Sequence, residues 1–319
     1  MDLRQRKISP TMPKELFLNN LTFDQLTEEY FKVDAKDLMA KHGKSFYFAS
    51  CIFKESDLEK IATLYRLCRF IDDCADELPP AESARAMASI FDDLNHPHNQ
   101  TSFNLLMAEV EAFGVQRWQI KELLIGAQFD VQGGQILTQK DLMLYCFRVA
   151  GVVGLMMCPL IGVTSPKAYA HSIDLGLGMQ LTNICRDISE DADNNRSYLP
   201  NLNSMAPEDI KNLVRETLDM ADRYYFSAYD GLSYIPIRPR IVILLAGELY
   251  RHIGIKIRRN HYDITGGRTY LKLWEKILVS IKCLFKLGQS FFWKSKGHHS
   301  SLHFPIQDHI QGYTQGNIG

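Results

Sequence analysis

A polar stripe inside an otherwise apolar helical stretch constrains this chain most. Gln180, Asn183, Asp187 and Asp191 stand at i, i+3, i+7 and i+11, with Ile184 among the apolar residues between them. Eleven residues at about 3.6 per turn make close to three turns, so the four side chains share one helix face. Carboxylates stacked one turn apart repel by about 0.2–0.5 kcal/mol per pair. Such a face makes sense beneath a cation, and its oxygen atoms suit a hard divalent ion such as Mg2+.

A second stripe of the same length lies upstream. Tyr65, Arg69, Asp72 and Asp76 occupy i, i+4, i+7 and i+11 within the stretch Leu64–Leu78. Solvated helix faces also carry acids, and that alternative holds for either stripe taken alone. Two matching stripes in apolar helices favour a joint role. If the helices face each other, their acids could hold several divalent ions around a substrate diphosphate.

The composition indicates an ordinary globular protein. The chain has 319 residues, of which 46% are hydrophobic and 23% charged. Its net charge of −1 gives no basic field for nucleic acid, so no nucleic-acid partner is expected. The 7 cysteines stand singly without C-x-x-C spacing, which predicts reduced thiols in a cytoplasmic protein. The first ten residues lack the apolar core of a secretory signal.

Helical periodicity predominates and strand signals are few, so the sequence predicts an all-α fold with one core. Besides the first stripe helix, the expected helices span residues 81–94, 101–113, 118–129, 140–156, 167–190, 207–232 and 239–257. We expect a loose N-terminal arm over residues 1–25, an all-α domain over 26–294 and a polar, disordered tail over 295–319. The apolar run Val149–Val163 is too short to span a bilayer and contains Pro159, so it predicts a buried core helix.

A short basic turn precedes the first stripe and consists of His42, Gly43, Lys44 and Ser45. It is not a P-loop, because Leu38 stands where that motif needs glycine. Its charges, hydroxyl and backbone N–H groups can still bind phosphate oxygens. An ordinary connection between helices is the alternative.

Residues 272–293 predict a basic amphipathic helix. Its apolar face carries Leu273, Trp274, Ile277, Leu278, Ile281 and Phe285, and its opposite side carries Lys272, Lys276, Lys282 and Lys286. Such a helix can lie on an anionic membrane, which would place the protein at the inner face of a membrane. A terminal helix packed on the protein body is the alternative. The tail histidines, His298, His299 and His303, carry no predicted function.

Five motifs together resemble the squalene/phytoene synthase family, from about residue 35 to about residue 280. They are His42-x-Lys44-Ser45-Phe46, Asp72-Asp73-Cys74-Ala75-Asp76, Tyr145-Cys146-x-x-Val149-Ala150-Gly151-x-Val153-Gly154, Asn183-x-x-Arg186-Asp187-x-x-x-Asp191, and Tyr250 followed by Arg268. The resemblance implies an all-α isoprenoid synthase fold around a central cavity. It also implies head-to-head condensation of two allylic prenyl diphosphates through a cyclopropyl intermediate, with Mg2+ or Mn2+ bridging acids and diphosphates. The sequence of these motifs is most similar to that of bacterial phytoene synthases, which use geranylgeranyl diphosphate and no nicotinamide.

The resemblance also assigns roles to residues. The implied metal ligands are Asp72, Asp76, Asn183, Asp187 and Asp191, and the four aspartates, Tyr65 and Arg69 are the implied catalytic residues. The implied diphosphate-binding residues are His42, Gly43, Lys44, Ser45, Tyr65, Arg69, Gln180, Arg186, Tyr250 and Arg268. Gly43 stands where some relatives carry a hydroxyl residue, so its contact would come through backbone. The implied cavity residues are Phe46, Tyr145, Val149, Ala150 and Gly154; single tyrosines such as Tyr65 and Tyr145 are otherwise more often core residues.

Three alternatives remain open at this point. A C30 synthase would condense farnesyl diphosphate to squalene, dehydrosqualene or presqualene diphosphate, and only squalene formation would consume NADPH. A head-to-tail or cyclising enzyme also carries acidic helical motifs, although Asp191 is not the usual end of a cyclase motif. A helical assembly protein without catalysis would have no use for repelling acids. Periodicity gives neither the substrate's chain length nor the oligomeric state.

Overall fold

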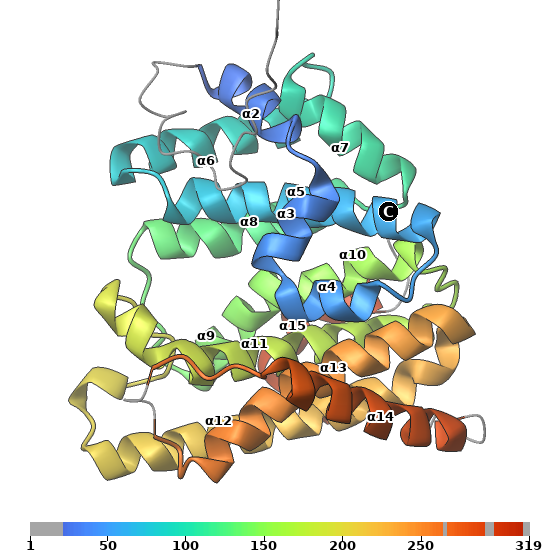
Figure 1. The fold of residues 1–319 in the computed structure, drawn as a ribbon. Helices are drawn as coiled ribbons and strands as arrows, with labels where there is room; N and C mark the ends of the chain where they lie inside the picture. The colour runs from blue at the N-terminus through green and yellow to red at the C-terminus, as the bar shows by residue number, and fades with distance from the viewer. Residues whose placement is uncertain (1–21, 264–266, 291–296, 315–319) are drawn as a thin grey trace, which may run out of the picture. The chain divides into compact units, whose positions relative to one another are not determined.

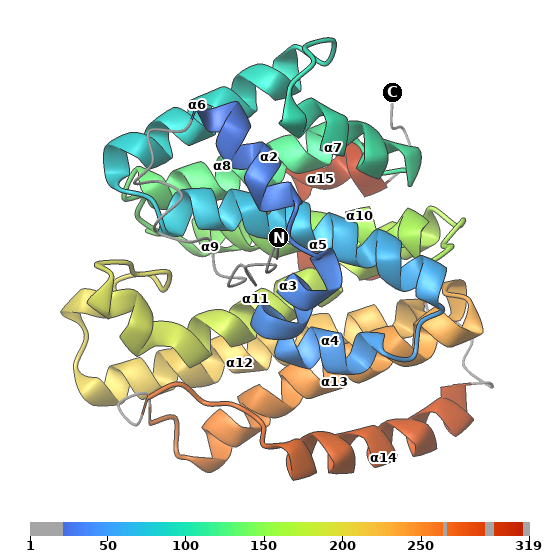
Figure 2. The same cartoon turned by 45° about the horizontal axis from the view of Figure 1, so that its top comes forward.

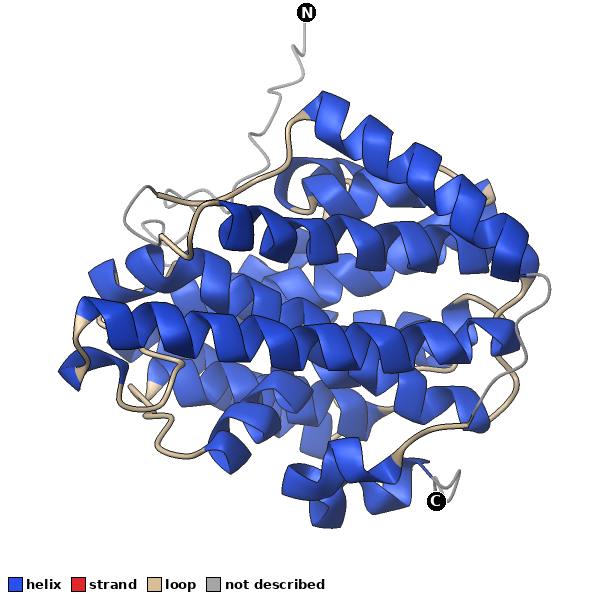
Figure 3. Cartoon of the chain, turned by 90° about the horizontal axis from the view of Figure 1, so that it is seen from below, coloured by secondary structure: helices blue, strands red, loops and turns tan. Residues whose placement is uncertain are grey.

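The computed structural model describes residues 22–263, 267–290 and 297–314, without the side chains of residue 203, residues 287–290 and residues 311–314. Across these residues the secondary structure is helical and contains no strand (Figure 3), which confirms the all-α prediction. The predicted arm falls mostly on residues 1–21, outside the described residues, and α2 begins within its last positions at Phe23.

The chain divides into two compact units, where the sequence suggested one domain. Unit 1 runs to Gln132 and unit 2 begins at Gly133. In unit 1 the helices are α2 (Phe23–Phe31), α3 (Ala35–His42), α4 (Lys44–Ser50), α5 (Glu55–Asp76), α6 (Pro80–Asn95), α7 (Ser102–Ala112) and α8 (Arg117–Val131). Those of unit 2 are α9 (Gln139–Cys146), η1 (Phe147–Gly151), α10 (Val152–Leu160), α11 (Lys167–Asp193), η2 (Leu202–Ser204), α12 (Pro207–Asp230), η3 (Gly231–Tyr234), α13 (Ile237–Arg259), α14 (Leu273–Ser290), η4 (Ser300–Ile306) and α15 (Gln307–Thr314).

Helix α5 is the centre of unit 1 and contacts α3, α6, α7 and α8. Leu64, Leu67 and Ile71 recur at helical spacing on its buried side, each at most 2% exposed. Phe70 adds an aromatic cluster, its ring centroid lying 5.1 Å from that of Tyr30. The helix ends at Asp76, and Pro80 opens α6 at a position where its missing N–H costs nothing. This packing fixes which face of α5 carries the first stripe.

Helix α11 is the corresponding centre of unit 2 and contacts α9, α10, α12 and α13 (Figure 1). We expected the helix to end at about Glu190, but it continues to Asp193, and the turn is made by Asn195 with a φ of 56°. Asp191 therefore stays on the same helix as Asp187. All four residues of the second stripe lie on one regular helix.

The apolar run predicted to be a core helix forms part of a longer stretch, Gln139–Leu160. Among the described residues it is the one stretch apolar and long enough to cross a membrane, with a mean hydropathy of 1.7, but 61% of it is buried in the protein. Its second half packs on α11. Periodicity did not predict η1, a π-helical turn over Phe147–Gly151 that interrupts the α-helix. Single π turns are frequent at functional sites, and this one carries Val149 and Ala150.

Two glycines let the backbones of η1–α10 and α11 touch. A Cβ on Gly154 would lie 2.1 Å from the Ser172 carbonyl oxygen, and one on Gly176 would lie 2.3 Å from that of Ala150. Gly154, which the resemblance assigned to the cavity, thus packs against the backbone of α11.

The C-terminal residues differ from the expected disordered tail over 295–319. Over residues 297–314 they form η4 and α15, and they bury Ile306 and Ile310 at 2% and 1% exposure. Helix η4 contacts α9, and α15 contacts α11. Ahead of them, α14 lies along α13 (Figure 2), within the range predicted for the amphipathic helix; residues 291–293 of that range lie outside the described residues.

Substituting Gly176 tests the backbone contact. We expect Gly176→Ala to lower the midpoint of urea denaturation by an amount equivalent to about 1–3 kcal/mol, because its Cβ would overlap a carbonyl oxygen. The matched control is Gly178→Ala on the same helix, whose Cβ would have no neighbour closer than 3.3 Å. Both changes gain the same helix propensity of about 1 kcal/mol. Circular dichroism gives the midpoints, and a Gly176→Ala midpoint at or above that of Gly178→Ala would contradict the packing.

Candidate active site

The first stripe lies along α5 in unit 1. Tyr65, Arg69 and Asp72 are half-buried, and Asp76 is exposed in the last turn of the helix. Burial raises the pKa of Asp72 to about 7, with Asp76 and Asp130 adding to the effect and the charge of Arg69 opposing it. Asp130, on α8, is an acid that the sequence analysis missed. A bound cation would relieve this crowding of negative charge.

Asp73 is the second residue that the sequence analysis did not assign. It is 2% exposed and faces the core, where its Oδ1 lies 2.5 Å from Arg69 Nη2. The hydroxyl of Tyr30 donates to its other oxygen at 2.8 Å. Arg69 is thus held from the buried side, while its Nε is buried and has no hydrogen-bond partner among the described residues. The Arg69 Nε, a guanidinium donor within the first stripe, could therefore bind an anionic ligand.

The basic turn lies against the same helix. A Cβ on Gly43 would be 3.2 Å from a ring carbon of Tyr65 and 3.3 Å from its hydroxyl oxygen, so glycine makes room for Tyr65. The Gly43 N–H already donates to the Met39 carbonyl at 2.8 Å, so this N–H is not available to a phosphate. His42 is near enough to Asp73 to lower the pKa of that carboxyl, against the larger opposing effect of burial. Lys44 is exposed and Ser45 half-buried at the start of α4.

The second stripe lies along α11 in unit 2, and its four side chains are half-buried. The Asn183 Nδ2 donates to the Gln180 Oε1 at 3.3 Å, one turn earlier. The Asn183 Oδ1 is buried and has no hydrogen-bond partner within the described residues. A buried acceptor without a partner costs about 1–3 kcal/mol, which a bound cation would offset. This oxygen is where the sequence analysis placed a metal ligand.

Three of the predicted diphosphate-binding residues gather around Asp187. Arg186 donates to both of its carboxylate oxygens, Nε to Oδ1 at 2.7 Å and Nη2 to Oδ2 at 2.5 Å. Arg268 lies 3.2 Å from Asp187 Oδ1 and also 3.2 Å from Glu190 Oε2. Burial raises the pKa of Tyr250, on α13, and the nearby charges of Arg186 and Arg268 oppose that rise. Two cations and a phenol hydroxyl therefore surround one carboxylate.

The predicted cavity residues have different surroundings. Tyr145 is buried and stacks on Tyr198, with ring centroids 4.8 Å apart and planes 19° apart. Val149 and Ala150 lie half-buried on η1, whereas Gly154 packs on the α11 backbone. Phe46 belongs to α4 of unit 1 and is half-buried.

A hollow of about 420 Å3 in unit 2 is lined mainly by α12, together with the start of α9 and Pro200. None of the predicted site residues lines it. The charged residues predicted for the site therefore lie elsewhere, most of them on α5 and α11.

The donor atoms fit Mg2+. Asp72 and Asp76 supply carboxylate oxygens in unit 1, and Asn183, Asp187 and Asp191 supply amide and carboxylate oxygens in unit 2. The free Asn183 Oδ1 is the observation that supports this fit. The acids of each unit are accompanied by arginine, so an anion can be held on the same surfaces.

Known proteins are similar to this chain in sequence and in fold. The family model described as squalene/phytoene synthase matches residues 39–275. The chain is 34% identical to a phytoene synthase from Rhodobacter capsulatus over 75% of this chain and 78% of that protein. It is 31% identical to a 15-cis-phytoene synthase from Pantoea ananas over 83% of this chain and 93% of that protein.

Solved structures agree on the fold. A dehydrosqualene synthase with a bound ligand superposes with a TM-score of 0.73 at 24% identity, over 84% of this chain and 100% of that one. A squalene synthase from Alicyclobacillus acidocaldarius gives a TM-score of 0.65 at 19% identity, over 74% of this chain and 96% of that one. The predicted isoprenoid synthase fold is thus confirmed, and the chain belongs to the squalene/phytoene synthase family.

Proposed function

We propose that this protein joins two molecules of geranylgeranyl diphosphate head to head into phytoene, through a cyclopropyl diphosphate and with Mg2+. As a member of its family it is a prenyltransferase, and phytoene synthases match it at about 30% identity over most of its length. The observation that carries the proposal is the free Asn183 oxygen on a carboxylate stripe whose Asp187 is surrounded by arginines. That arrangement suits a metal-bound diphosphate.

The chain's own residues would hold and orient the diphosphate. Asp72 and Asp76 in unit 1, and Asn183, Asp187 and Asp191 in unit 2, would hold Mg2+, which would neutralise diphosphate charge and make it a better leaving group. Arg69 offers its free Nε to a phosphate oxygen. Arg186 and Arg268 pair with Asp187 and would be able to bind diphosphate oxygens instead if that carboxylate bound Mg2+. Each arginine thus exchanges a carboxylate for a phosphate and keeps a charged partner.

The atoms balance without a reductant. Two C20 diphosphates lose two diphosphate ions and two protons to form the C40 hydrocarbon. Squalene formation differs because the final carbocation takes up hydride from NADPH. The carbocations must be kept from water, and we place the prenyl chain along the apolar surface of η1 beside Val149 and Ala150. The stacked rings of Tyr145 and Tyr198 could stabilise cationic carbon by about 0.5–2 kcal/mol each.

A product assay tests the proposal. The purified protein receives Mg2+ and either geranylgeranyl or farnesyl diphosphate, each with and without NADPH, and lipid extracts go to mass spectrometry. We expect a C40 hydrocarbon from geranylgeranyl diphosphate, in equal yield with and without NADPH. A C30 product from farnesyl diphosphate, with no product from geranylgeranyl diphosphate, would show the alternative C30 activity instead. No product from either substrate would favour a helical protein without catalysis.

Neutralising one acid of each stripe tests the metal role. We expect Asp72→Asn and Asp187→Asn each to lower turnover by about 100-fold or more, because charge stabilisation of the leaving group is lost. The matched control is Asp193→Asn, an exposed acid on α11 that lies off the stripe. Steady-state kinetics at saturating Mg2+ and thermal melts are compared for all three variants. Full activity in both stripe variants, with unchanged melting, would show that the aspartates are not metal ligands in the reaction.

We also propose that α14 rests on a membrane surface. It packs on α13 through Val279 and Cys283, which are 3% and 5% exposed. Its apolar side faces outward, with Trp274 at 59% and Phe285 at 75% exposure. The four lysines were expected on the side opposite the apolar face. Lys286 lies on the side that packs on the protein, with its Nζ 2.7 Å from Glu248 Oε1 on α13, whereas Lys272 and Lys282 are exposed.

This arrangement presents an apolar strip with Lys272 and Lys282 exposed at its edges. An anionic bilayer suits that surface, because the apolar side chains can enter the headgroup region while the two cations meet lipid phosphates. The proposed product gives a reason for the contact, since a C40 hydrocarbon is insoluble in water and must leave into lipid. The contact would place the protein at the inner face of a membrane.

Vesicle co-sedimentation tests the membrane contact. We expect Ile281→Glu to lower binding to phosphatidylglycerol-containing vesicles by about tenfold, because a fully buried isoleucine side chain contributes about 1.5–3 kcal/mol. The control is Leu105→Glu on α7, which replaces another exposed apolar side chain, 66% exposed, outside α14. Equal binding of the wild type and Ile281→Glu would contradict the proposal. Product formation in detergent is measured in parallel, so that loss of folding is distinguished from loss of lipid contact.

A further inference from the structure

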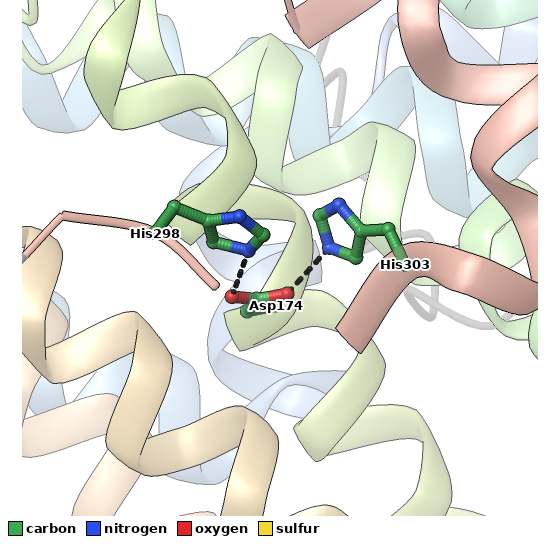
Figure 4. A group of neighbouring side chains, drawn as sticks. All are labelled: Asp174, His298 and His303. Carbon is green, nitrogen blue, oxygen red and sulfur yellow. Dashed lines mark hydrogen bonds and ion pairs between the residues drawn. The ribbon is translucent and has the colours of Figure 1, made fainter. Parts of the chain in front are cut away.

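A buried carboxylate and two histidines meet in unit 2, away from the acidic stripe. Figure 4 shows the rings of His298 and His303 directed at the Asp174 carboxylate, one at each oxygen. The His298 Nε2 lies 3.0 Å from Asp174 Oδ2, and the His303 Nε2 lies 2.6 Å from Oδ1. Asp174 comes from α11 and the histidines from the C-terminal segment, so contacts over more than a hundred residues of sequence build this cluster.

Three residues hydrogen-bond to the buried Asp174 carboxylate. Asp174 is 0% exposed and His303 4% exposed. The Ser227 hydroxyl donates to Asp174 Oδ2 at 2.5 Å. Burial alone would raise the pKa of Asp174, but the hydrogen bonds from His298 and His303 outweigh it and hold the pKa below its usual value. A buried negative charge needs a positive partner, either a protonated imidazole or a cation.

The three residues lie close enough together to share one metal ion. One ligand atom from each of the three residues can be chosen so that all lie within 4.8 Å of one another. With zinc–nitrogen and zinc–oxygen bonds of about 2.0–2.2 Å, neighbouring ligand atoms are about 3.3 Å apart. The observed separations of 3.0 and 2.6 Å, each to a different oxygen of Asp174, would have to widen by about 0.3 and 0.7 Å to reach that spacing. Two imidazoles and one carboxylate suit Zn2+ and not Mg2+, which prefers oxygen.

We propose that Asp174, His298 and His303 bind one Zn2+ ion that fastens the C-terminal segment 297–314 to α11. Ser227 orients the carboxylate, and the fourth coordination position is left for water. The site is separate from the proposed Mg2+ donors, because Asp174 and Asp187 are thirteen residues apart on one helix, or about 20 Å along its axis. Both histidines also lie beyond residues 39–275, the part of the chain that matches the family.

Metal binding to untagged, full-length protein tests the proposal. After dialysis against a chelator, the protein is titrated with Zn2+, and separately with Co2+ as a spectroscopic probe, both with Mg2+ in large excess. We expect one equivalent of Zn2+, visible Co2+ bands of a tetrahedral nitrogen–oxygen site, and a higher melting temperature with Zn2+. His298→Ala and His303→Ala should each weaken binding at least tenfold and abolish the Zn2+-dependent rise in melting temperature.

The matched control is His299→Ala, which removes an exposed histidine from the same segment. It should bind Zn2+ as the wild type does. Equal weakening in His299→Ala would show surface binding by neighbouring histidines and overturn the proposal. So would wild-type protein that shows no tetrahedral Co2+ spectrum, in which case the three residues form a hydrogen-bonded cluster with a protonated imidazole. The spectrum of the wild type decides the question even if a histidine variant fails to fold.

Discussion

Crowding of negative charge on two helices is the constraint on which this structure depends. Helix α5 in unit 1 and helix α11 in unit 2 each carry aspartates at one-turn spacing, where like charges repel. Each unit offsets this with guanidinium groups: Arg69 lies on Asp73, and Arg186 and Arg268 lie on Asp187. The same groups suit metal-bound diphosphate, because the acids can bind cations while the arginines bind phosphate oxygens.

Close backbone packing positions these charges in unit 2. Because Gly154 and Gly176 lack side chains, η1 and α10 lie directly on α11, which carries Asn183 and Asp187. The π-helical turn η1 lies at this contact and carries the half-buried residues assigned to the prenyl chain. Rigid backbone contact is a physical basis for holding an apolar surface at a defined place relative to the metal donors.

Helix α11 carries residues of two proposed sites of different chemistry. Its C-terminal half offers oxygen donors suited to Mg2+, and Asp174 in its N-terminal half joins two imidazoles suited to Zn2+. The imidazoles come from a segment outside the residues that match the squalene/phytoene synthase family. The family relationship therefore accounts for the stripe, whereas the histidine cluster is a property of the C-terminal segment of this chain.

The sequence by itself determined the helices, the two stripes and the family. Helical period depends on neighbouring residues alone, so the stripe on α11 and the stop at the two prolines after α5 could be read without tertiary contacts. Tertiary structure decided which neighbours each of these residues contacts. Asp73 faces the core and forms an ion pair with Arg69. Asp130, on another helix, helps to raise the pKa of Asp72. The Gly43 N–H donates to the Met39 carbonyl of α3. Tertiary structure also made residues 297–314 of the segment that composition marked as disordered into η4 and α15, where His303 contacts Asp174. These outcomes depend on distances between segments far apart in the chain, which local periodicity does not encode.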